Sequence, residues 1–148
     1  MIRLATKDDL PRLLTLGKEM HEESNYASFS YYQEGVEKML TSLLDGGGVI
    51  FVAERGGEVI GGIAGMVYSP FFTKDKVATD MGLFISKTTR GLMTAPLLIK
   101  TFTNWAEEQP GVKQIRPGIS LGGKTEGVSK LYERCGYQTV GAVFMKEV

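Results

Sequence analysis

Hydrophobic and polar residues follow two different periods along the chain. In the first quarter, apolar or small residues recur every three or four positions, at Leu10, Leu13, Leu14, Gly17 and Met20. This spacing places them on one face of a helix. From residue 49 to residue 68, β-branched and apolar residues form two runs separated by the compact turn 55–58, which predicts a β-hairpin. The pattern therefore predicts helices followed by strands.

Turn and capping residues bound the other predicted elements. Thr6, with the acids Asp8 and Asp9 in the turn that follows, favours a helix start, and the glycine run 46–48 favours a helix end. The predicted strands cover residues 2–5, 49–54, 59–68, 77–86, 112–119 and 137–146. The predicted helices are the one that follows Thr6 and those over residues 31–44, 96–108 and 125–135.

The order β-α-α-β-β-β-α-β-α-β predicts an α/β (α+β) fold with a mixed sheet. Its middle strands form an antiparallel meander, and its later strands are joined by helical crossovers. No repeat, charge block or Pro/Ser-rich linker divides the chain. We therefore expect residues 1–148 to form a single domain.

Composition and charge narrow the class of function. The chain has 43% hydrophobic and 23% charged residues, and its 17 basic residues balance 17 acidic ones. A net charge of zero argues against a nucleic-acid partner or an anionic membrane surface. The N-terminus shows no signal-peptide pattern, and the most apolar stretch, 59–68, is too short to cross a bilayer. The expected location is the cytoplasm.

The counts of cysteine and histidine exclude several kinds of site. Cys135 is the only cysteine and His21 the only histidine. One cysteine cannot form an internal disulfide or a cysteine-rich zinc site, and Cys135 has no second histidine or evident base to activate it. We expect no metal and no Ser-His-Asp triad, unless His21 itself is the base.

Two segments could carry chemistry. The strand–loop–helix unit 83–95 would point unpaired backbone N–H groups and a helix dipole at one place, which suits a pyrophosphate, although most such loops bind nothing. Segment 129–137 indicates a helix that Gly136 ends, with Leu131 facing inward. Alternatively, Tyr132 in that helix could act as a hydroxyl acid near a leaving group.

Taken together, these segments resemble the GNAT (Gcn5-related N-acetyltransferase) superfamily over the whole chain. The best match is the run Leu-Tyr-Glu-Arg-Cys-Gly-Tyr at residues 131–137, which is similar to the family's "LYEKLGF". The opening "MIRLATKDDLPRLLTLGKEMHEES" also resembles short members of phage or prophage type. The resemblance implies an acetyl-CoA-dependent N-acetyltransferase with a GNAT-like fold.

The resemblance implies a binding site for acetyl-CoA. Backbone groups of Phe84 and Ile85 would contact the pantetheine arm, and Thr125 stands where many relatives have an asparagine that contacts CoA, unless it only caps the last helix. The loop that would hold the pyrophosphate comprises Thr89, Arg90, Gly91, Leu92, Met93, Thr94 and Ala95.

Arg90 and Gly91 match the family's usual "RG", but the loop departs from the motif at one position. Met93 stands where the first signature glycine is expected, and its Cβ would limit close approach of the backbone. Ala95 is an accepted variant of the second glycine, whereas Pro96 removes one N–H donor. The departure at Met93 puts the affinity for CoA in question.

The resemblance also implies catalytic roles. Tyr132 would protonate the departing CoA thiolate, and Asp80 is the candidate base for the acceptor amine. Asp80 lies two residues before Gly82, where relatives often carry glutamate, and we expect both to face the same side of the strand. A solvated carboxylate at a strand end is the alternative interpretation of Asp80.

The acyl acceptor is expected to be a small-molecule or peptide amine. Glu22, Phe71 and Phe72 are candidates to line its site, with His21 beside Glu22. A solvated helix end explains Glu22 and His21 just as well, and an aromatic loop packed on the sheet is the commoner arrangement for Phe71 and Phe72. A homodimer is possible, through the exposed edge of the last strand.

Two other functions stay open. A GNAT-fold binding protein without turnover would agree with the departure at Met93 and the lack of a clear base. Residues 118–125 also satisfy G-x-x-x-x-G-K-T, a P-loop pattern in which Lys124 and Thr125 would contact phosphates and magnesium. However, only 23 residues follow Thr125, which is too few for a P-loop sheet, so a glycine-rich turn before a helix is the simpler interpretation.

Overall fold

Five strands form one mixed sheet in the computed structural model, which describes residues 1–90, 93–118 and 125–148. Their order across the sheet is the same as their order along the chain. The first four strands pair antiparallel, whereas β5 runs parallel to β4. The strands are β1 (Ile2–Leu4), β2 (Val49–Arg55), β3 (Glu58–Tyr68), β4 (Lys76–Ile85) and β5 (Val112–Ile115).

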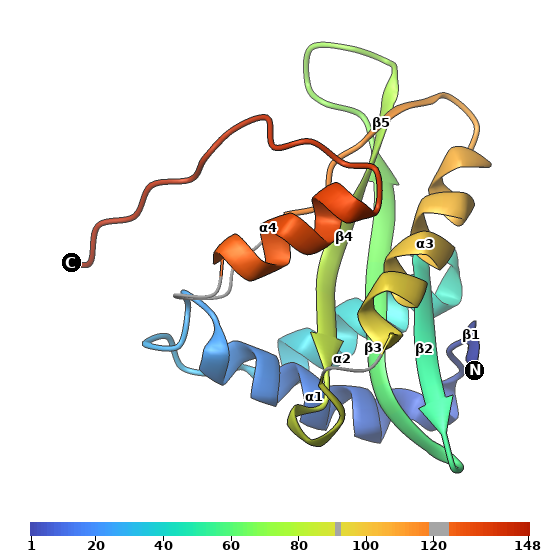
Figure 1. Ribbon diagram of the computed structural model, residues 1–148, viewed down its shortest axis with the longest axis vertical. Coiled ribbons are helices and arrows are strands. Elements are labelled where there is room, and N and C mark those ends of the chain that lie inside the picture. Colours follow the sequence, from blue (N-terminus) through green and yellow to red (C-terminus); the bar gives the residue numbers. More distant parts are fainter. Residues whose placement is uncertain (91–92, 119–124) are drawn as a thin grey trace.

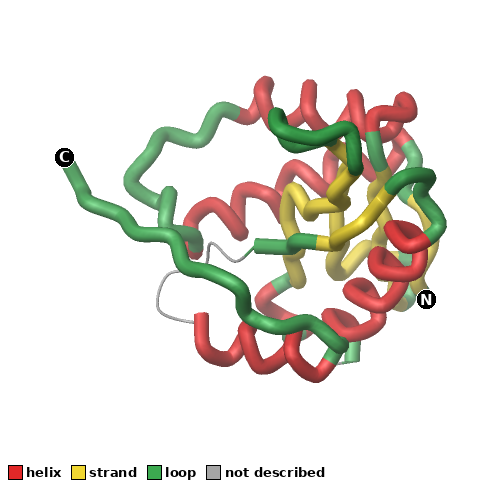
Figure 2. Tube along the Cα trace, turned by 90° about the horizontal axis from the view of Figure 1, so that it is seen from above, coloured by secondary structure: helices red, strands yellow, loops and turns green. Residues whose placement is uncertain are grey.

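Helices cover both faces of this sheet. Figure 1 shows α3 and α4 in front of the strands and α1 and α2 behind them, and Figure 2 shows the strands between the two helical layers. The predicted α/β mixed sheet is therefore confirmed. The helices are α1 (Leu10–Glu23), α2 (Gln33–Ser42), α3 (Thr94–Glu107) and α4 (Thr125–Arg134).

The described residues form two apolar core clusters, one on each face of the sheet. Behind the sheet, Leu13 and Leu16 of α1 pack with Val52 of β2. In front of it, Leu98 and Phe102 of α3 form the centre of the second cluster. The helical spacing of the first stripe and the alternation of the strands produce this arrangement, because each directs apolar side chains to one layer.

An ion-pair cluster fixes the N-terminal strand to the start of α1. The guanidinium of Arg3 donates to both oxygens of Asp9, at 2.8 and 2.9 Å, and to Glu54 of β2 at 2.9 Å. Asp9 also accepts the backbone N–H of Thr6 at 2.8 Å, closing the predicted helix start as a 3-10 turn (Lys7–Asp9). These contacts hold the pKa of Asp9 below its usual value, chiefly through the hydrogen bond from Arg3.

The predicted last strand, over residues 137–146, is not formed. Tyr137 is held at the end of α4, where its N–H donates to Tyr132 O at 3.1 Å. Beyond it the chain has no helix or strand and runs away from the sheet, as Figure 1 shows. A strand needs a neighbouring strand for its backbone hydrogen bonds, and this segment pairs with none of the described strands.

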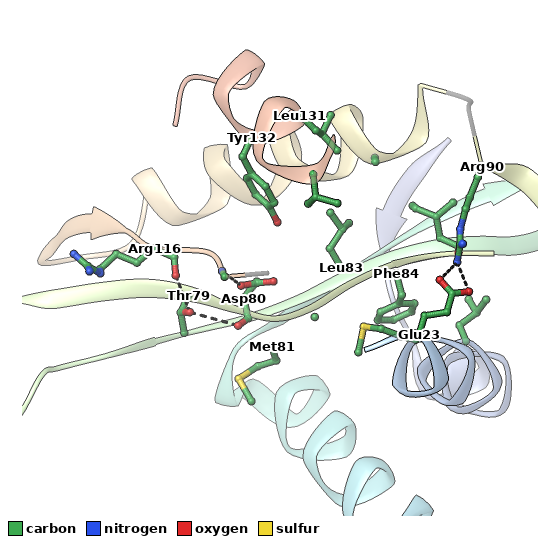
Figure 3. A pocket seen from close by; sticks show the side chains of 17 residues that line it. Glu23, Thr79, Asp80, Met81, Leu83, Phe84, Arg90, Arg116, Leu131 and Tyr132 are labelled. Atoms are coloured by element: carbon green, nitrogen blue, oxygen red, sulfur yellow. Dashed lines mark hydrogen bonds and ion pairs between the residues drawn. The ribbon is translucent and has the colours of Figure 1, made fainter. Parts of the chain in front are cut away.

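A β-bulge changes which side chains of β4 share a face. Gly65 of β3 lies opposite Asp80, and Ala64 lies opposite Gly82, so Met81 is the extra residue. Gly82 faces α1, because a Cβ on it would lie 3.1 Å from Met20 Cε. Asp80 lies on the opposite side of β4, the side from which Tyr132 points toward the strand (Figure 3). The expectation that Asp80 and Gly82 face the same side was therefore wrong.

Candidate functional site

A cavity of about 520 Å³ lies between β4 and the helices around it. Its size is within the range of small-molecule sites, roughly 300–1,000 Å³. It is lined by residues of α1, β4 and α4, by Arg90 and Ala95 around the start of α3, and by Arg116 and Gly118 after β5. Figure 3 shows the side chains of these residues.

One edge of β4 is open where it borders this cavity. β5 pairs with β4 only from Lys76 to Ala78, so from residue 80 to residue 85 β4 has no strand on that edge in the described part of the chain. Ser86 N–H donates to Ile60 O of β3 at 2.8 Å. Neighbouring residues of a strand direct their backbone groups to opposite edges, so those of Ile85 face the open edge.

The same alternation separates the two residues predicted to contact pantetheine. Both Phe84 and Ile85 line the cavity. The backbone groups of Phe84 face β3, however, whereas the carbonyl of Ile85 lies 3.4 Å from an Arg90 Nη donor at the open edge. Leu83, which sequence reasoning did not single out, shares the orientation of Ile85. The backbone groups of Ile85 and Leu83 therefore face the open edge beside the cavity.

Tyr132 lies on α4, and its hydroxyl points toward β4 (Figure 3). The residue is buried, and among the described residues its hydroxyl has no hydrogen-bond partner. Its ring packs edge-on against Tyr137 at 5.6 Å between centroids. Burial raises the pKa of Tyr132 well above its ordinary value, and the nearby charge of Asp80 raises it further. The phenol is therefore protonated at neutral pH and able to donate.

Asp80 lines the same cavity, at the bulge. One carboxylate oxygen accepts the backbone N–H of Gly118 at 2.9 Å. Burial raises the pKa of Asp80, although this hydrogen bond acts in the opposite direction. A carboxylate with a raised pKa is a stronger base, so the cavity holds a proton acceptor near a proton donor.

The predicted pyrophosphate loop is only partly at the cavity. Ala95, in the first turn of α3, and Arg90, which precedes that helix, line it. Thr94 is buried as the first residue of that helix, and the hydroxyl of Thr89 donates to Ser86 O at 3.2 Å. Gly91 and Leu92 lie outside the described residues.

The side chain of Met93 does not obstruct the cavity. It is 70% exposed and is not among the residues that line the cavity. Thr125, the other predicted CoA contact, begins α4. Of the P-loop pattern, residues 119–124 lie outside the described residues, and Gly118 donates its N–H to Asp80.

Sequence reasoning missed Glu23, a charged residue of the cavity. Its carboxylate accepts from Arg90 Nη2 at 2.8 and 2.9 Å and lies 3.5 Å from Lys87 Nζ. A signal for it was present, because Leu16, Met20 and Glu23 continue the helical spacing of α1 and all three line the cavity. Arg116, which also lines it, had no comparable signal.

The residues expected at the acceptor site lie elsewhere. Phe71 and Phe72 are exposed on the β3–β4 loop, pack edge-on against each other at 5.4 Å, and do not line the cavity. Glu22 of α1 is exposed and does not line the cavity. His21 Nε2 lies 2.8 Å from Phe29 O and so fixes the loop that follows α1.

The described residues were also compared with the requirements of a metal site and of a membrane span. Among the described residues, no group of three or more His, Cys, Asp or Glu side chains could hold a metal ion. None of the helices in that part of the chain has both the length and the apolar character that a membrane span requires.

Comparisons with known proteins agree with this geometry. A family model described as "Acetyltransferase (GNAT) domain" matches residues 46–139. No curated protein matches the chain in a sequence search. Nothing in these comparisons supports a phage origin.

Several crystal structures share the fold. A possible acetyltransferase from Clostridium difficile is 16% identical, with a TM-score of 0.76 over 100% of this chain and 97% of that one. A ribosomal-protein-alanine N-acetyltransferase from Brucella melitensis is 24% identical, with a TM-score of 0.76 over 95% and 86%. An aminoglycoside acetyltransferase from a soil metagenomic sample is 18% identical, with a TM-score of 0.71 over 100% and 95%. At these identities the likeness concerns the fold alone.

Proposed function

This chain belongs to the acetyltransferase (GNAT) family, and we propose that it transfers an acetyl group from acetyl-CoA to an amine by direct attack in a ternary complex. One observation carries the proposal. The open edge of β4 borders a cavity into which Tyr132 directs a buried hydroxyl that has no partner among the described residues. The open edge of β4 suits an extended chain of amides, and the Tyr132 hydroxyl suits a leaving group that needs a proton.

Acetyl-CoA would bind along the open edge and at the start of α3. Backbone groups of Leu83 and Ile85 are oriented to pair with the amides of the pantetheine arm. The first turn of α3 offers the N–H groups of Thr94 and Ala95 to a pyrophosphate, with the guanidinium of Arg90 beside them. The exposed position of the Met93 side chain supports this proposal, because it leaves the cavity open.

In the chemical step, the amine nitrogen attacks the thioester carbonyl, and the carbon–sulfur bond breaks as the amide forms. A backbone N–H at the open edge of β4 would stabilise the oxyanion. Tyr132 gives its proton to the departing sulfur. Asp80 takes the proton that the amine loses, so the number of protons is conserved across the step.

Asp80→Asn tests the role of the base. We expect kcat/KM near neutral pH to fall by about 10²–10⁴-fold, the usual contribution of general acid–base catalysis. The acidic limb of the pH profile, which the raised pKa of Asp80 moves upward, should disappear in the variant. A parent-like pH profile for Asp80→Asn would exclude Asp80 as the base.

Calorimetric titration with acetyl-CoA tests the proposed function directly, with ATP–magnesium as the comparison ligand. We expect micromolar binding of acetyl-CoA and none of ATP. Ala95→Glu should abolish that binding, because it places a negative charge in the cavity at the start of α3. Thr101→Glu, which adds the same charge six residues further along α3 and outside the cavity, is the matched control.

The outcomes separate the candidate functions. Binding of acetyl-CoA together with release of CoA thiol in a screen of amines supports the transferase. Binding without turnover on any amine would favour a GNAT-fold binding protein. Binding of ATP–magnesium in place of acetyl-CoA would contradict the proposal and favour the P-loop interpretation of residues 118–125.

A further inference from the structure

A second cavity, of about 480 Å³, lies between α1, α2 and the loop that joins them. Aromatic rings gather on it, and its lining includes His21, Tyr26, Phe29, Tyr31 and Tyr32. Among the described residues that line it there is no Asp, Glu, Lys or Arg. A ligand in this cavity therefore meets aromatic and apolar walls, and none of these walls carries a carboxylate.

Hydrogen bonds and ring contacts hold this loop in place. His21 Nε2 donates to Phe29 O at 2.8 Å, and the hydroxyl of Tyr31 donates to Leu14 O of α1 at 3.3 Å. The ring of Tyr26 packs edge-on against that of Phe29, with centroids 5.6 Å apart. The rings are thus ordered before a ligand arrives, which lowers the entropic cost of binding.

Three of the rings are largely exposed, although all of them line the same cavity. The exposed fraction is 55% for Tyr26, 62% for Phe29 and 68% for Tyr32. Isolated apolar side chains on a surface are common, but a group of them around one hollow is typical of a binding site. A ligand that covers these rings removes apolar area from water, which favours its binding.

The second cavity continues from the first one. Met20 of α1 and Met81 of β4 line both cavities. Figure 3 shows Met81 on the side of β4 away from Tyr132. Methionine side chains are flexible and adapt to what they contact, so the boundary between the two cavities consists of adaptable side chains.

The position of Asp80 indicates which part of an acceptor enters the second cavity. Asp80, the proposed base, directly precedes Met81, and neighbouring Cα atoms are ~3.8 Å apart. An amine whose nitrogen lies at Asp80 therefore has its substituent close to Met81 and to the second cavity. A polyamine would place further cations against uncharged walls, which costs free energy. An aromatic substituent gains both apolar burial and ring–ring contacts there.

We propose that the acceptor is a primary amine joined by a short link to an aromatic ring, and that this ring binds in the second cavity beside Phe29 and Tyr32. The inference rests on the proposed function, because it assigns the acceptor of that same reaction. A free arylalkylamine and a peptide that begins with phenylalanine share this chemistry, since two carbon atoms separate the nitrogen from the ring in both.

A panel of amines tests the preference, with release of CoA thiol as the readout. We expect kcat/KM for 2-phenylethylamine to exceed that for propylamine by about 10- to 150-fold, the equivalent of burying one phenyl ring. It should also exceed the value for spermidine. A tripeptide amide that begins with phenylalanine identifies the source: a rate above that of 2-phenylethylamine assigns the acceptor to peptide N-termini, and a lower rate assigns it to free amines.

Phe29→Ala removes one ring from the second cavity, and because Phe29 is exposed, the core keeps its packing. The ratio of kcat/KM for 2-phenylethylamine to that for propylamine should fall about two- to tenfold, the value of one aromatic pair. Phe71→Ala, which removes an exposed phenylalanine outside both cavities, should leave this ratio unchanged. A parental ratio in Phe29→Ala, or an equal fall in Phe71→Ala, would overturn the proposal.

Saturation-transfer NMR measures binding of 2-phenylethylamine without catalysis, and so separates this inference from the proposed function. If propylamine or spermidine is acetylated at least as fast as 2-phenylethylamine, the transferase stands and the aromatic acceptor is wrong. If 2-phenylethylamine binds, and binds more weakly to Phe29→Ala, but no amine is acetylated, the aromatic cavity is supported and the transferase is wrong. Absence of both binding and acetylation contradicts both.

Discussion

The Tyr132→Phe substitution removes one buried oxygen atom, and we expect it to raise the free energy of unfolding while it lowers turnover. The hydroxyl of Tyr132 is buried without a partner among the described residues, so folding removes it from water without replacing its hydrogen bonds. An unsatisfied buried polar group costs about 1–3 kcal/mol. The ring itself stays packed against Tyr137, so little packing is lost.

The expected size of the effect follows from these values. Because the hydroxyl borders a cavity, we expect the lower part of that range, ~1–2 kcal/mol of added stability. For a domain of about this length each kcal/mol moves Tm by about 2–4 °C, so Tm should rise by roughly 2–8 °C. Turnover should fall by about 10²–10⁴-fold, the loss expected when a general acid is removed.

Tyr137→Phe is the matched control. It removes the same atom from the neighbouring ring, but that hydroxyl has a partner, Thr103 Oγ1 at 2.6 Å. Its loss should lower stability by about 1 kcal/mol, the net value of a hydrogen bond. The two variants should therefore change Tm in opposite directions.

Thermal unfolding followed by circular dichroism measures stability, and release of CoA thiol measures turnover on an accepted amine. If Tyr132→Phe melts below the parent, the hydroxyl has a partner in the folded protein and the reasoning from its burial is refuted. If it melts higher but turns over at the parental rate, Tyr132 is not the acid.

Three further predictions follow from the ion pairs and the core. Asp9→Asn should lower the free energy of unfolding by about 1.5–3 kcal/mol at neutral pH, because the charged hydrogen bonds from Arg3 are lost. The pKa of Asp9 is lower in the folded than in the unfolded protein. The difference in free energy of unfolding between parent and variant, measured by urea unfolding, should therefore be fully present above pH 3.8, the ordinary pKa, and disappear as pH falls through the lower folded pKa. A difference that does not change with pH would contradict the role of the charge. Glu23→Gln should tighten the binding of acetyl-CoA, measured by calorimetry, by about two- to fivefold. In the parent, Arg90 must leave its ion pair with Glu23, worth ~0.5–1 kcal/mol, to reach the pyrophosphate, and the variant removes that cost. Weaker binding by the variant would mean that the ion pair holds Arg90 in the position that binds the pyrophosphate. Phe102→Ala should cost about 3–5 kcal/mol in chemical denaturation, since Phe102 is fully buried at the centre of the α3 cluster, and a loss below 1 kcal/mol would contradict that packing.

Local patterns in the sequence were sufficient for most of the fold. The stripe from Leu10 to Met20 and the two apolar runs around the turn 55–58 specify α1 and the β2–β3 hairpin, because each pattern fits only one backbone period. Residues 131–137 indicated the family, and the structure places Tyr132 at the cavity together with Asp80 and Arg90. Their catalytic and binding roles remain predictions.

Local sequence patterns could not predict features that depend on contacts between distant segments of the chain. The bulge at Met81 is a shift in register between β3 and β4, and no residue type in the sequence predicts it. The ion pair between Glu23 and Arg90 joins residues 67 positions apart in the chain. The last strand failed as a prediction for the same reason, since the apolar pattern of 137–146 shows that the segment can form a strand but not which edge accepts it.

By itself, the sequence determined the periods, the turns and the family motif, all of which depend on neighbouring residues. Only the tertiary structure decided which face of β4 carries Asp80. It also decided which edge of that strand has no neighbouring strand, and which hydroxyl is buried without a partner, among the residues that the structure describes. Burial and backbone pairing are properties of segments brought together by folding, so the chemistry of the cavity became visible only when β4, α3 and α4 were placed around it.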